Sequence, residues 1–496
     1  MLPSQCPPFG LPSMVPQTRS AQLIVTGLID VRDKFHSNFC AMRERLQLGA
    51  VLLLVFVVFM PSMHYELVYD DFQQLVTNPR LTAWSYVPGY FTSNLWSHLP
   101  ELPHYYRPVF LLWFRLLYAT LGAPSSTWHF ASILAHVATT ACVFVLIRRL
   151  VDDFKGAALA AVLFAIHPID AEPVAWVSSA GDPLVTIFLT LSVSYYVKRM
   201  GPVSLCSILF AALAMFTKEA GIVAPPLILA YEWTHSRLKN AVVAAAPYAL
   251  PALLYLAFRV HALGNPMKVA GPTSLAAMIF TWPRLLSLYA LHLIWPVHLG
   301  LGYDVPVETA FWPLLLLLGV IAGLGWLLRG SSANIRFGAA WFGITLIPSL
   351  AIRYIDSHDY VHDRYLYLPT VGLALVAAVW FARIRFTRPR VIAAGALALA
   401  LCWGTRANLR VWQNNISLFS RAIETDPQNP DFRNNLAVAY IDAHRESEAY
   451  PLLKQLIEMY PWYADGYYNM GYYYQQIGNP EEAKRYYLIW ASKQHN

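Results

Sequence analysis

Two adjacent aspartates, Asp70 and Asp71, stand shortly after the apolar run GAVLLLVFVVFM. A carboxylate near a membrane boundary costs free energy unless it reaches water, pairs with a cation or takes part in a reaction. A positioned carboxylate can also act as a general base that accepts a proton from a reacting hydroxyl. We therefore take this pair as the catalytic candidate and expect both side chains to face water. The alternatives are a solvated loop start and a helix cap.

Further acids and bases occur where other apolar runs end. They are His167, Glu172 and Asp182 in and after HPIDAEPVAW, Lys218 and Glu219 in TKEAG, and the arginines Arg107, Arg259 and Arg364. Acids and an imidazole at such ends can bind a polar ligand or a metal, and cations there can hold an anion. The bland alternatives are a proline-rich turn for HPIDAEP and a lysine that snorkels to the interface.

The segment SHDYVHDR contains His358, Asp359, His362 and Asp363. It resembles a metal cluster, but we interpret it as a polar loop near a bound ligand. The spacing of the acids and histidine around HPIDAEP also fits no established set of metal ligands. We therefore predict no metal site and assign no cofactor, and we leave a divalent cation open.

The composition indicates a membrane protein. Of 496 residues, 57% are hydrophobic and only 13% are charged, about half the charged share of soluble proteins. The net charge of +7 does not indicate nucleic-acid binding, because the basic residues form short clusters between apolar runs, where orientation signals lie. The five cysteines show neither a disulfide framework nor zinc-ligand spacing.

Charged flanks divide the apolar part into eleven predicted spans with a cytoplasmic N-terminus. The spans are 48–63, 128–147, 157–166, 183–197, 203–216, 222–233, 241–258, 311–329, 337–352, 367–381 and 391–403. This topology puts the basic clusters on one face and YDD, HPIDAE, TKE and HDYVHDR on the other. Two semi-apolar helices, 105–122 and 274–299, are expected to lie in the interface or dip into it, because charges interrupt them.

Three domains follow from this division. Residues 1–47 form a proline-rich cytoplasmic tail, largely disordered, and 48–405 form a membrane domain with large outer loops at 64–127 and 261–310. Residues 406–496 form tetratricopeptide repeats: a half repeat at 406–429 and full repeats at 430–463 and 464–496. The repeats rest on matches at an offset of 34, such as Ala437 with Gly471 and Tyr440 with Tyr474. By the same topology they lie outside the cytoplasm.

Several motifs in a fixed order carry a family resemblance. LVYDDFQQLVTNPRL, YYRPVFLLWFRLLYATLG, WHFASILAHVATT, HPIDAEPVAW, TKEAGI and RYLYLP, followed by the repeats, resemble the transmembrane and tetratricopeptide-repeat-containing O-mannosyltransferases and their bacterial relatives. The resemblance covers the chain from about Leu48 onward. It differs in two places: Gly181 stands where relatives tend to carry arginine, and the repeat array is short.

The resemblance implies an all-α, multi-span glycosyltransferase of the GT-C type. Such an enzyme moves a sugar, here a mannose-like hexose, from a polyprenyl phosphate to an acceptor hydroxyl at the extracytoplasmic face of the bilayer. It implies Asp70 and Asp71 as catalytic residues, with Asp70 matching the first acid of the family's pair, and Arg364 in RYLYLP as the first choice for the phosphate.

Lys218 and Arg107 would assist at the phosphate, while His167, Glu172, Asp182 and Glu219 would contact the sugar or the acceptor. The acceptor would be a protein or peptide held by the repeats. A bacterial inner membrane with periplasmic repeats is favoured, or the endoplasmic reticulum with luminal repeats if the chain is eukaryotic. The alternatives are a non-catalytic scaffold whose repeats bind peptides, and a transporter. A scaffold needs no cluster of acids and bases, and a transporter needs a broken midplane helix or an inverted repeat, which the sequence does not show.

Overall fold

The computed structural model describes residues 42–99, 105–122, 124–198, 204–264, 273–355, 360–385 and 387–493. Within these ranges every regular element is a helix and no strand occurs, as the sequence predicts. The chain divides into two compact units, residues 1–54 and 55–496. The described part of the first unit, residues 42–54, is helical. Apart from residues 42–54 of the first candidate span, all elements named below belong to the second unit.

Eight helical segments in the described ranges are long and apolar enough to cross a membrane, which confirms a multi-span membrane protein. They are Met42–His64, Ser125–Val151, Val177–Lys198, Leu238–Leu263, Leu275–Ile294, Ala333–Tyr354, Asp363–Arg383 and Arg388–Trp412. A ninth is the pair Phe154–Ala165 and Pro168–Ala175, bent by 54°, if the pair is one span. The predicted count of eleven is not confirmed.

Four segments differ from the expected spans in length. The predicted fifth and eighth spans correspond to α8 (Leu205–Thr217, 13 residues) and α13 (Trp312–Leu328, 17 residues), which are shorter than these segments. The predicted sixth span corresponds to α9 (Ala224–His235), which has 12 residues and is not among these segments. The segment expected to dip contains α12 (Leu275–Ile294), whose 20 residues pass the same test. Helix α12 packs against two short helical turns, η9 (Ile347–Leu350) and η12 (Asp363–Leu366). Length and composition do not distinguish a dipping helix from a crossing one, so the dipping of α12 stays a prediction.

The membrane part contains further helices, which differ widely in length. They are η1 (Met60–His64), η2 (Phe72–Val76), η3 (Pro79–Leu81), η4 (Trp84–Tyr86), α2 (Val87–Tyr90), α3 (Pro108–Leu121), α4 (Ser125–Val151), α5 (Phe154–Ala165), η5 (Pro168–Asp170), α6 (Ala171–Ala175), η6 (Val177–Ser179), α7 (Gly181–Lys198), α8 (Leu205–Thr217), η7 (Glu219–Val223), α10 (Leu238–Ala245), η8 (Ala246–Tyr248), α11 (Ala249–Leu263), α13 (Trp312–Leu328), α14 (Ala333–Leu346), η10 (Ile352–Tyr354), α15 (Tyr367–Arg383), α16 (Arg388–Leu409) and η13 (Arg410–Trp412).

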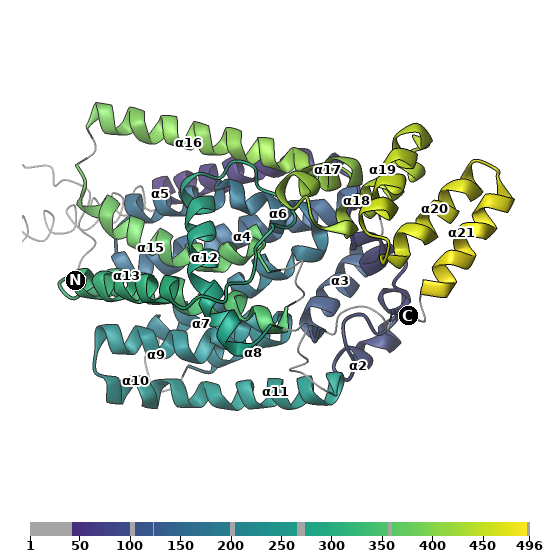
Figure 1. Cartoon of the computed structure of the whole chain (residues 1–496). Helices are drawn as coiled ribbons and strands as arrows, with labels where there is room; N and C mark the ends of the chain where they lie inside the picture. Colours follow the sequence, from purple (N-terminus) through teal and green to yellow (C-terminus); the bar gives the residue numbers. More distant parts are fainter. Residues whose placement is uncertain are drawn as a thin grey trace, which may run out of the picture. The chain divides into compact units, whose positions relative to one another are not determined.

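Burial separates central helices from peripheral ones. The apolar stretch that contains α7 is 78% buried, whereas that of α16 is 11% buried, and α13 has no buried residue. Bare apolar surfaces such as Leu316 of α13 and Leu399 of α16 are expected of helices that face lipid. In Figure 1, α11, α13 and α16 run along the outside of the unit.

Small residues let the central helices approach closely. A Cβ on Gly372 of α15 would lie 2.3 Å from the main-chain oxygen of Gly338 of α14, and one on Gly338 would lie 2.7 Å from that of Gly372. A larger residue at either position would therefore force α14 and α15 apart. Interfaces of membrane helices use small residues in this way. Helix α15 also contacts η12, which contains Arg364, so the close packing of α14 and α15 helps to fix the position of Arg364.

The loop before α3 is folded around a buried arginine. Arg80, 7% exposed, donates from Nη1 to the Asn94 oxygen (2.9 Å) and to Ser97 Oγ (2.7 Å). Its Nη2 donates to the Gly89 oxygen (3.1 Å) and to Ser93 Oγ (2.9 Å). These hydrogen bonds satisfy a buried charge and fix the segment that follows Asp71.

The C-terminal residues form two helical hairpins after a single helix. The helices are α17 (Asn415–Thr425), α18 (Pro430–Asp442), α19 (Glu446–Met459), α20 (Ala464–Gln476) and α21 (Pro480–Lys493). The starts of α18 and α20 are 34 residues apart, and so are those of α19 and α21. The hairpins have the predicted period, and their assignment as tetratricopeptide repeats stays a prediction. Figure 1 shows them at the end of the unit where α2 and α3 also lie.

Candidate active site

Asp71 anchors the turn on which both aspartates lie. Its Oδ1 accepts a hydrogen bond from the Ser178 N–H (2.7 Å), and its Oδ2 accepts longer ones from the N–H groups of Val177 (3.4 Å) and Val68 (3.3 Å). Its exposed fraction is 0%. The expectation that Asp71 faces water is therefore wrong, because main-chain donors of η6 enclose the carboxylate.

Asp70 has a different environment on the same turn. It is half-buried, and its Oδ1 accepts a hydrogen bond of 2.8 Å from Nε1 of Trp176. Burial raises the pKa of Asp70 to about 6, although Trp176 and the charge of Arg364 act in the opposite direction. Burial and the neighbouring Asp70 charge raise the pKa of Asp71 to about 7. Asp70 is thus a carboxylate of unusual basicity that is mainly ionised at neutral pH.

The local backbone explains why the two side chains diverge. Tyr69 has a φ of 57°, a left-handed conformation that is uncommon outside glycine. The next turn, η2, is a π-helix, a form that often occurs at functional sites. Non-standard backbone on both sides therefore directs adjacent aspartates to different partners.

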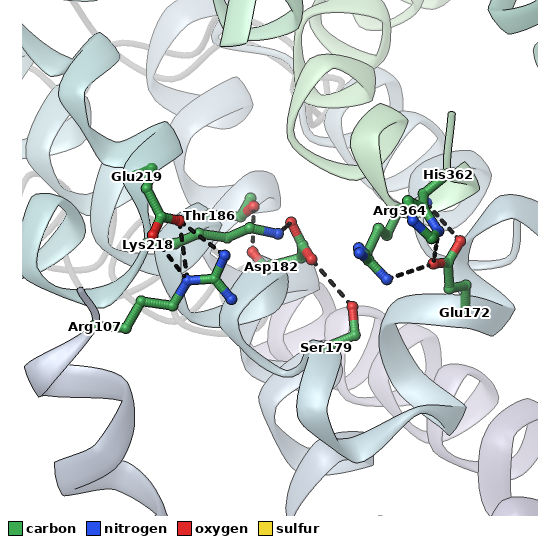
Figure 2. Close-up of polar contacts among 9 residues, drawn as sticks. All are labelled: Arg107, Glu172, Ser179, Asp182, Thr186, Lys218, Glu219, His362 and Arg364. Carbon is green, nitrogen blue, oxygen red and sulfur yellow. Dashed lines mark hydrogen bonds and ion pairs between the residues drawn. The ribbon is translucent and has the colours of Figure 1, made fainter. Parts of the chain in front are cut away.

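Three ion pairs join the predicted acids and bases that follow other apolar runs (Figure 2). In the first, Arg107 Nη2 lies 2.8 Å from Glu219 Oε2, and Arg259 adds a contact of 3.4 Å to the same carboxylate. Burial raises the pKa of Glu219, but Arg107 and Arg259 outweigh it and bring that pKa down to about 2. Glu219 is therefore ionised, and its charge balances two guanidinium groups.

The second pair joins Lys218 to Asp182, with 2.5 Å between Nζ and Oδ1. Ser179 Oγ donates to the other carboxylate oxygen of Asp182 (3.1 Å). Both Lys218 and Asp182 are buried, so snorkelling does not explain the lysine. Burial lowers the pKa of Lys218, and the charges of Arg107 and Arg364 lower it further. The charge of Asp182 opposes this lowering, and Lys218 is the cation on which the arginines of the other two pairs act.

The third pair joins Arg364 to Glu172. Arg364 Nη1 lies 2.9 Å from Glu172 Oε1, and the Arg364 main-chain N–H donates to Oε2 (3.0 Å). His362 Nδ1 lies 3.1 Å from the same carboxylate. The Arg364 guanidinium also lies over the Trp176 ring, 4.3 Å from its centroid. Trp176 therefore contacts both Asp70 and Arg364.

The structure brings eight of the nine predicted site residues into this connected cluster. His167 is the exception, because it caps η5 by accepting from the Ile169 N–H (3.4 Å), while its Nε2 lies 3.1 Å from the Leu293 oxygen. Among the described residues these contacts link His167 to main-chain groups and to none of the acids. Its geometry is that of a residue that joins η5 to α12.

The SHDYVHDR segment is described in part. His358 and Asp359 lie outside the described residues. Asp363 accepts from the Tyr303 hydroxyl (2.8 Å) and lies 2.8 Å from His292 Nδ1. Within the described ranges no group of three or more His, Cys, Asp or Glu residues could hold a metal ion. The interpretation as a polar loop beside the site agrees with these contacts.

Several residues of this cluster had no role in the sequence prediction. Trp176 ends the motif HPIDAEPVAW, but a tryptophan at such a position is equally typical of the membrane interface. Its residue type therefore does not indicate a role in the site. Ser178 donates its main-chain N–H to Asp71, a group that every residue type except proline supplies. Asn415, which accepts from the Tyr69 N–H, and Trp412, which stacks on Trp176, come from the C-terminal segment, and no local pattern connects them to Asp70. The sequence indicates Arg259 only as a cation on the same face as the acids.

The comparisons with known proteins bear out the resemblance. No family model matches the chain. Over 411 residues it is 23% identical to a protein O-mannosyl-transferase of Caenorhabditis elegans, which covers 78% of this chain and 59% of that protein. It is 22% identical to protein O-mannosyl-transferase TMTC3 of Homo sapiens, covering 90% and 55%, and 24% identical to TMTC1 of Homo sapiens, covering 83% and 54%. The chain thus spans a little over half the length of these relatives.

A solved structure also matches the chain. It is the crystal structure of ArnT from Cupriavidus metallidurans bound to undecaprenyl phosphate, with a TM-score of 0.41 and 14% identity, covering 90% of this chain and 75% of that one.

Proposed function

We propose that this protein is a glycosyltransferase that moves a sugar from a polyprenyl-phosphate donor to an acceptor hydroxyl. The observation that carries the proposal is the arrangement of Asp70. It is a half-buried carboxylate of raised pKa, joined through Trp176 to Arg364. Similarity to protein O-mannosyl-transferases supports a mannose-like hexose as the sugar and a protein hydroxyl as the acceptor.

In the proposed reaction Asp70 removes the proton from the acceptor hydroxyl. The hydroxyl oxygen then forms a bond to the anomeric carbon of the sugar, and the bond from that carbon to the donor phosphate breaks. The phosphate leaves with the electron pair, and the proton stays on Asp70. The growing negative charge on the phosphate is stabilised by Arg364, assisted by Lys218 and Arg107.

Each remaining acid has a supporting role in this proposal. Glu172, Asp182 and Glu219 each pair with a cation, which leaves them fewer lone pairs for sugar hydroxyls than the sequence suggested. They orient the cations and balance their charge before the donor arrives. Asp71 is enclosed by main-chain donors and holds the turn in place. The proton transfer is therefore assigned to Asp70 alone. No step of this proposal requires a metal, and the divalent cation stays open.

The proposed location follows from the charge argument. The repeats and the site lie on the extracytoplasmic face, either in the periplasm at a bacterial inner membrane or in the lumen of the endoplasmic reticulum. The test is transfer of radiolabelled mannose from a polyprenyl phosphate to protein in membranes that contain the chain. We expect wild type to transfer the label and Asp70→Asn to lose transfer at equal protein level. Equal transfer by membranes with and without the chain would overturn the proposal.

A further inference from the structure

The turn that carries Asp70 is held by residues beyond the last candidate span. The main-chain N–H of Tyr69, the residue with a φ of 57°, donates a 2.9 Å hydrogen bond to Oδ1 of Asn415. The Tyr69 ring also meets the Phe419 ring edge-on, with centroids 6.1 Å apart. Asn415 and Phe419 both belong to α17. Strain at a functional site persists only where the surroundings determine it, and α17 supplies these surroundings.

A second contact from the same segment acts on the indole that binds Asp70. Trp412 of η13 stacks on Trp176, with ring centroids 5.8 Å apart and an interplanar angle of 12°. Trp412 is only 3% exposed. Between these two supports, the Gln413 oxygen accepts from the Glu66 N–H (3.0 Å). The segment 412–415 therefore lies along the Asp70 turn and contacts both its backbone and its hydrogen-bond donor.

The start of α17 is itself fixed. Asn414 is the N-cap, and its side chain accepts from the Ser417 N–H while Ser417 Oγ accepts from the Asn414 N–H. Such a reciprocal capping box gives two main-chain N–H groups a hydrogen-bond acceptor and defines the helix start. The position of Asn415 is therefore fixed. A residue can orient another residue only if its own position is fixed.

We propose that Asn415 and Trp412 are positioning residues for Asp70, so that the first helix after the membrane domain is part of the catalytic site. This inference rests on the proposed function. Without Asn415, Tyr69 would relax from its left-handed conformation, and the carboxylate one residue later would turn toward water. Because α17 also packs against α18, the helical hairpins and Asp70 share one support.

The inference predicts a specific kinetic change. Asn415→Ala and Trp412→Leu should lower kcat by about 10-fold or more, since displacing a reacting group by about 1 Å can cost about 10²-fold. The KM for the donor should stay unchanged in Asn415→Ala, because Asn415 contacts the Tyr69 backbone and none of the cations of the three ion pairs. Trp412→Phe keeps a ring on Trp176, and Asn415→Asp keeps an acceptor for the Tyr69 N–H. Both should retain more of the wild-type kcat than the first two variants do.

A second measurement does not depend on transfer. A water-soluble carbodiimide modifies protonated carboxyl groups, so peptide mass spectrometry at a series of pH values gives the titration midpoint of Asp70. Asn415→Ala and Trp412→Leu should move this midpoint from about 6 toward the ordinary value of an exposed aspartate. The matched control is Asn479→Ala, which removes an asparagine that accepts from the Glu482 N–H (3.3 Å) in the last hairpin, and it should leave the midpoint unchanged.

The two readouts separate the inference from the proposed function. If wild type transfers no sugar, the proposed function fails, and the labelling midpoint alone decides the inference. If the midpoint and kcat of Asn415→Ala and Trp412→Leu both equal those of wild type while Asp70→Asn is inactive, the proposed function stands and the inference is overturned. Melting temperatures in detergent verify that each variant is folded.

Discussion

Nε1 of Trp176 donates a hydrogen bond of 2.8 Å to Oδ1 of Asp70, although 106 residues separate them in the sequence. The ring of the same tryptophan lies under the guanidinium of Arg364, 4.3 Å from the ring centroid. A single indole thus joins the carboxylate that we propose as the base to the cation that we propose for the phosphate. This relationship makes the protonation of Asp70 open to experiment.

Trp176→Phe should change the pH dependence of transfer. The indole N–H stabilises the ionised form of Asp70, so its loss should raise the pKa of Asp70 above about 6. Since the ionised form is active, the acid limb of the kcat/KM profile should move to higher pH. Trp282→Phe, which removes a hydrogen bond to the Leu350 oxygen, is the matched control and should leave the limb in place. An unmoved limb in Trp176→Phe would contradict Asp70 as the base.

Asn substitutions at the two aspartates should separate catalysis from folding. Asp70→Asn should abolish transfer with little change in melting temperature, because this side chain is half-buried and an amide oxygen can still accept the 2.8 Å hydrogen bond from Trp176. Asp71→Asn should unfold earlier, since an amide cannot accept at both positions where main-chain donors point. A loss of about 1–3 kcal/mol is typical of a buried polar group left without its partner. Equal melting temperatures for the two variants would show that Asp71 does not anchor the turn.

The sequence predicts the class of fold and most members of the site, but not their pairing. Apolar runs and basic flanks are local signals, and they suffice for an all-helical membrane protein with acids gathered at one face. Which cation meets which acid depends on side-chain packing between distant helices. Lys218 illustrates this, because its position after an apolar run fits snorkelling equally well, and only the packing of α7 on α8 reveals Asp182.

The buried pair Lys218–Asp182 should be tested by a double-mutant cycle. Lys218→Met leaves Asp182 buried without its cation, and breaking a buried pair in this way commonly costs about 3–5 kcal/mol. Adding Asp182→Asn should recover much of the lost stability, because no unpaired charge then remains. Thermal unfolding in detergent measures both variants. If Lys218→Met melts like wild type, the lysine is not held by Asp182 and is available as a free phosphate ligand.

The predicted orientation can be tested by labelling with a membrane-impermeant thiol reagent in a background without the native cysteines. Gln475→Cys, in the last helical hairpin, should react when the reagent is applied to the extracytoplasmic face. Ser331→Cys, between α13 and α14, should react only after permeabilisation. Ser357, a third position suited to this test, lies outside the described residues. Protection of Gln475→Cys in intact spheroplasts would place the hairpins in the cytoplasm and refute the charge argument.

Boundaries and counts are the parts of the fold that the sequence predicts least well. The predicted last span ends at Trp403, whereas α16 continues to Leu409, because polar residues such as Asn408 still bond within the helix. The contact between Asn415 and Tyr69 has no sequence signal at all. The contact joins the start of α17 to the turn at Tyr69, and the sequence of neither segment indicates that the other lies beside it.

Arg364 should decide the affinity for the donor. A charge-assisted hydrogen bond to a phosphate is worth about 1.5–3 kcal/mol, so Arg364→Ala should weaken donor binding by about 10-fold or more. Arg364→Lys should bind between that variant and wild type, because an ammonium keeps the charge but cannot present the planar fork to two phosphate oxygens. Lys218→Arg should likewise be milder than Lys218→Ala, and acceptor affinity should change little in all four variants.

The measurement is the Kd of purified protein for a short-chain polyprenyl-phosphate mannose in detergent. The control is Arg284→Ala, which removes a half-exposed arginine paired with Glu308 and should bind the donor like wild type. Because Arg364 also holds buried Glu172, each variant is compared at the same folded fraction, determined by thermal unfolding. If folded Arg364→Ala binds the donor with the wild-type Kd, Arg364 serves the fold or the acceptor, and the phosphate must be held by the other two ion pairs.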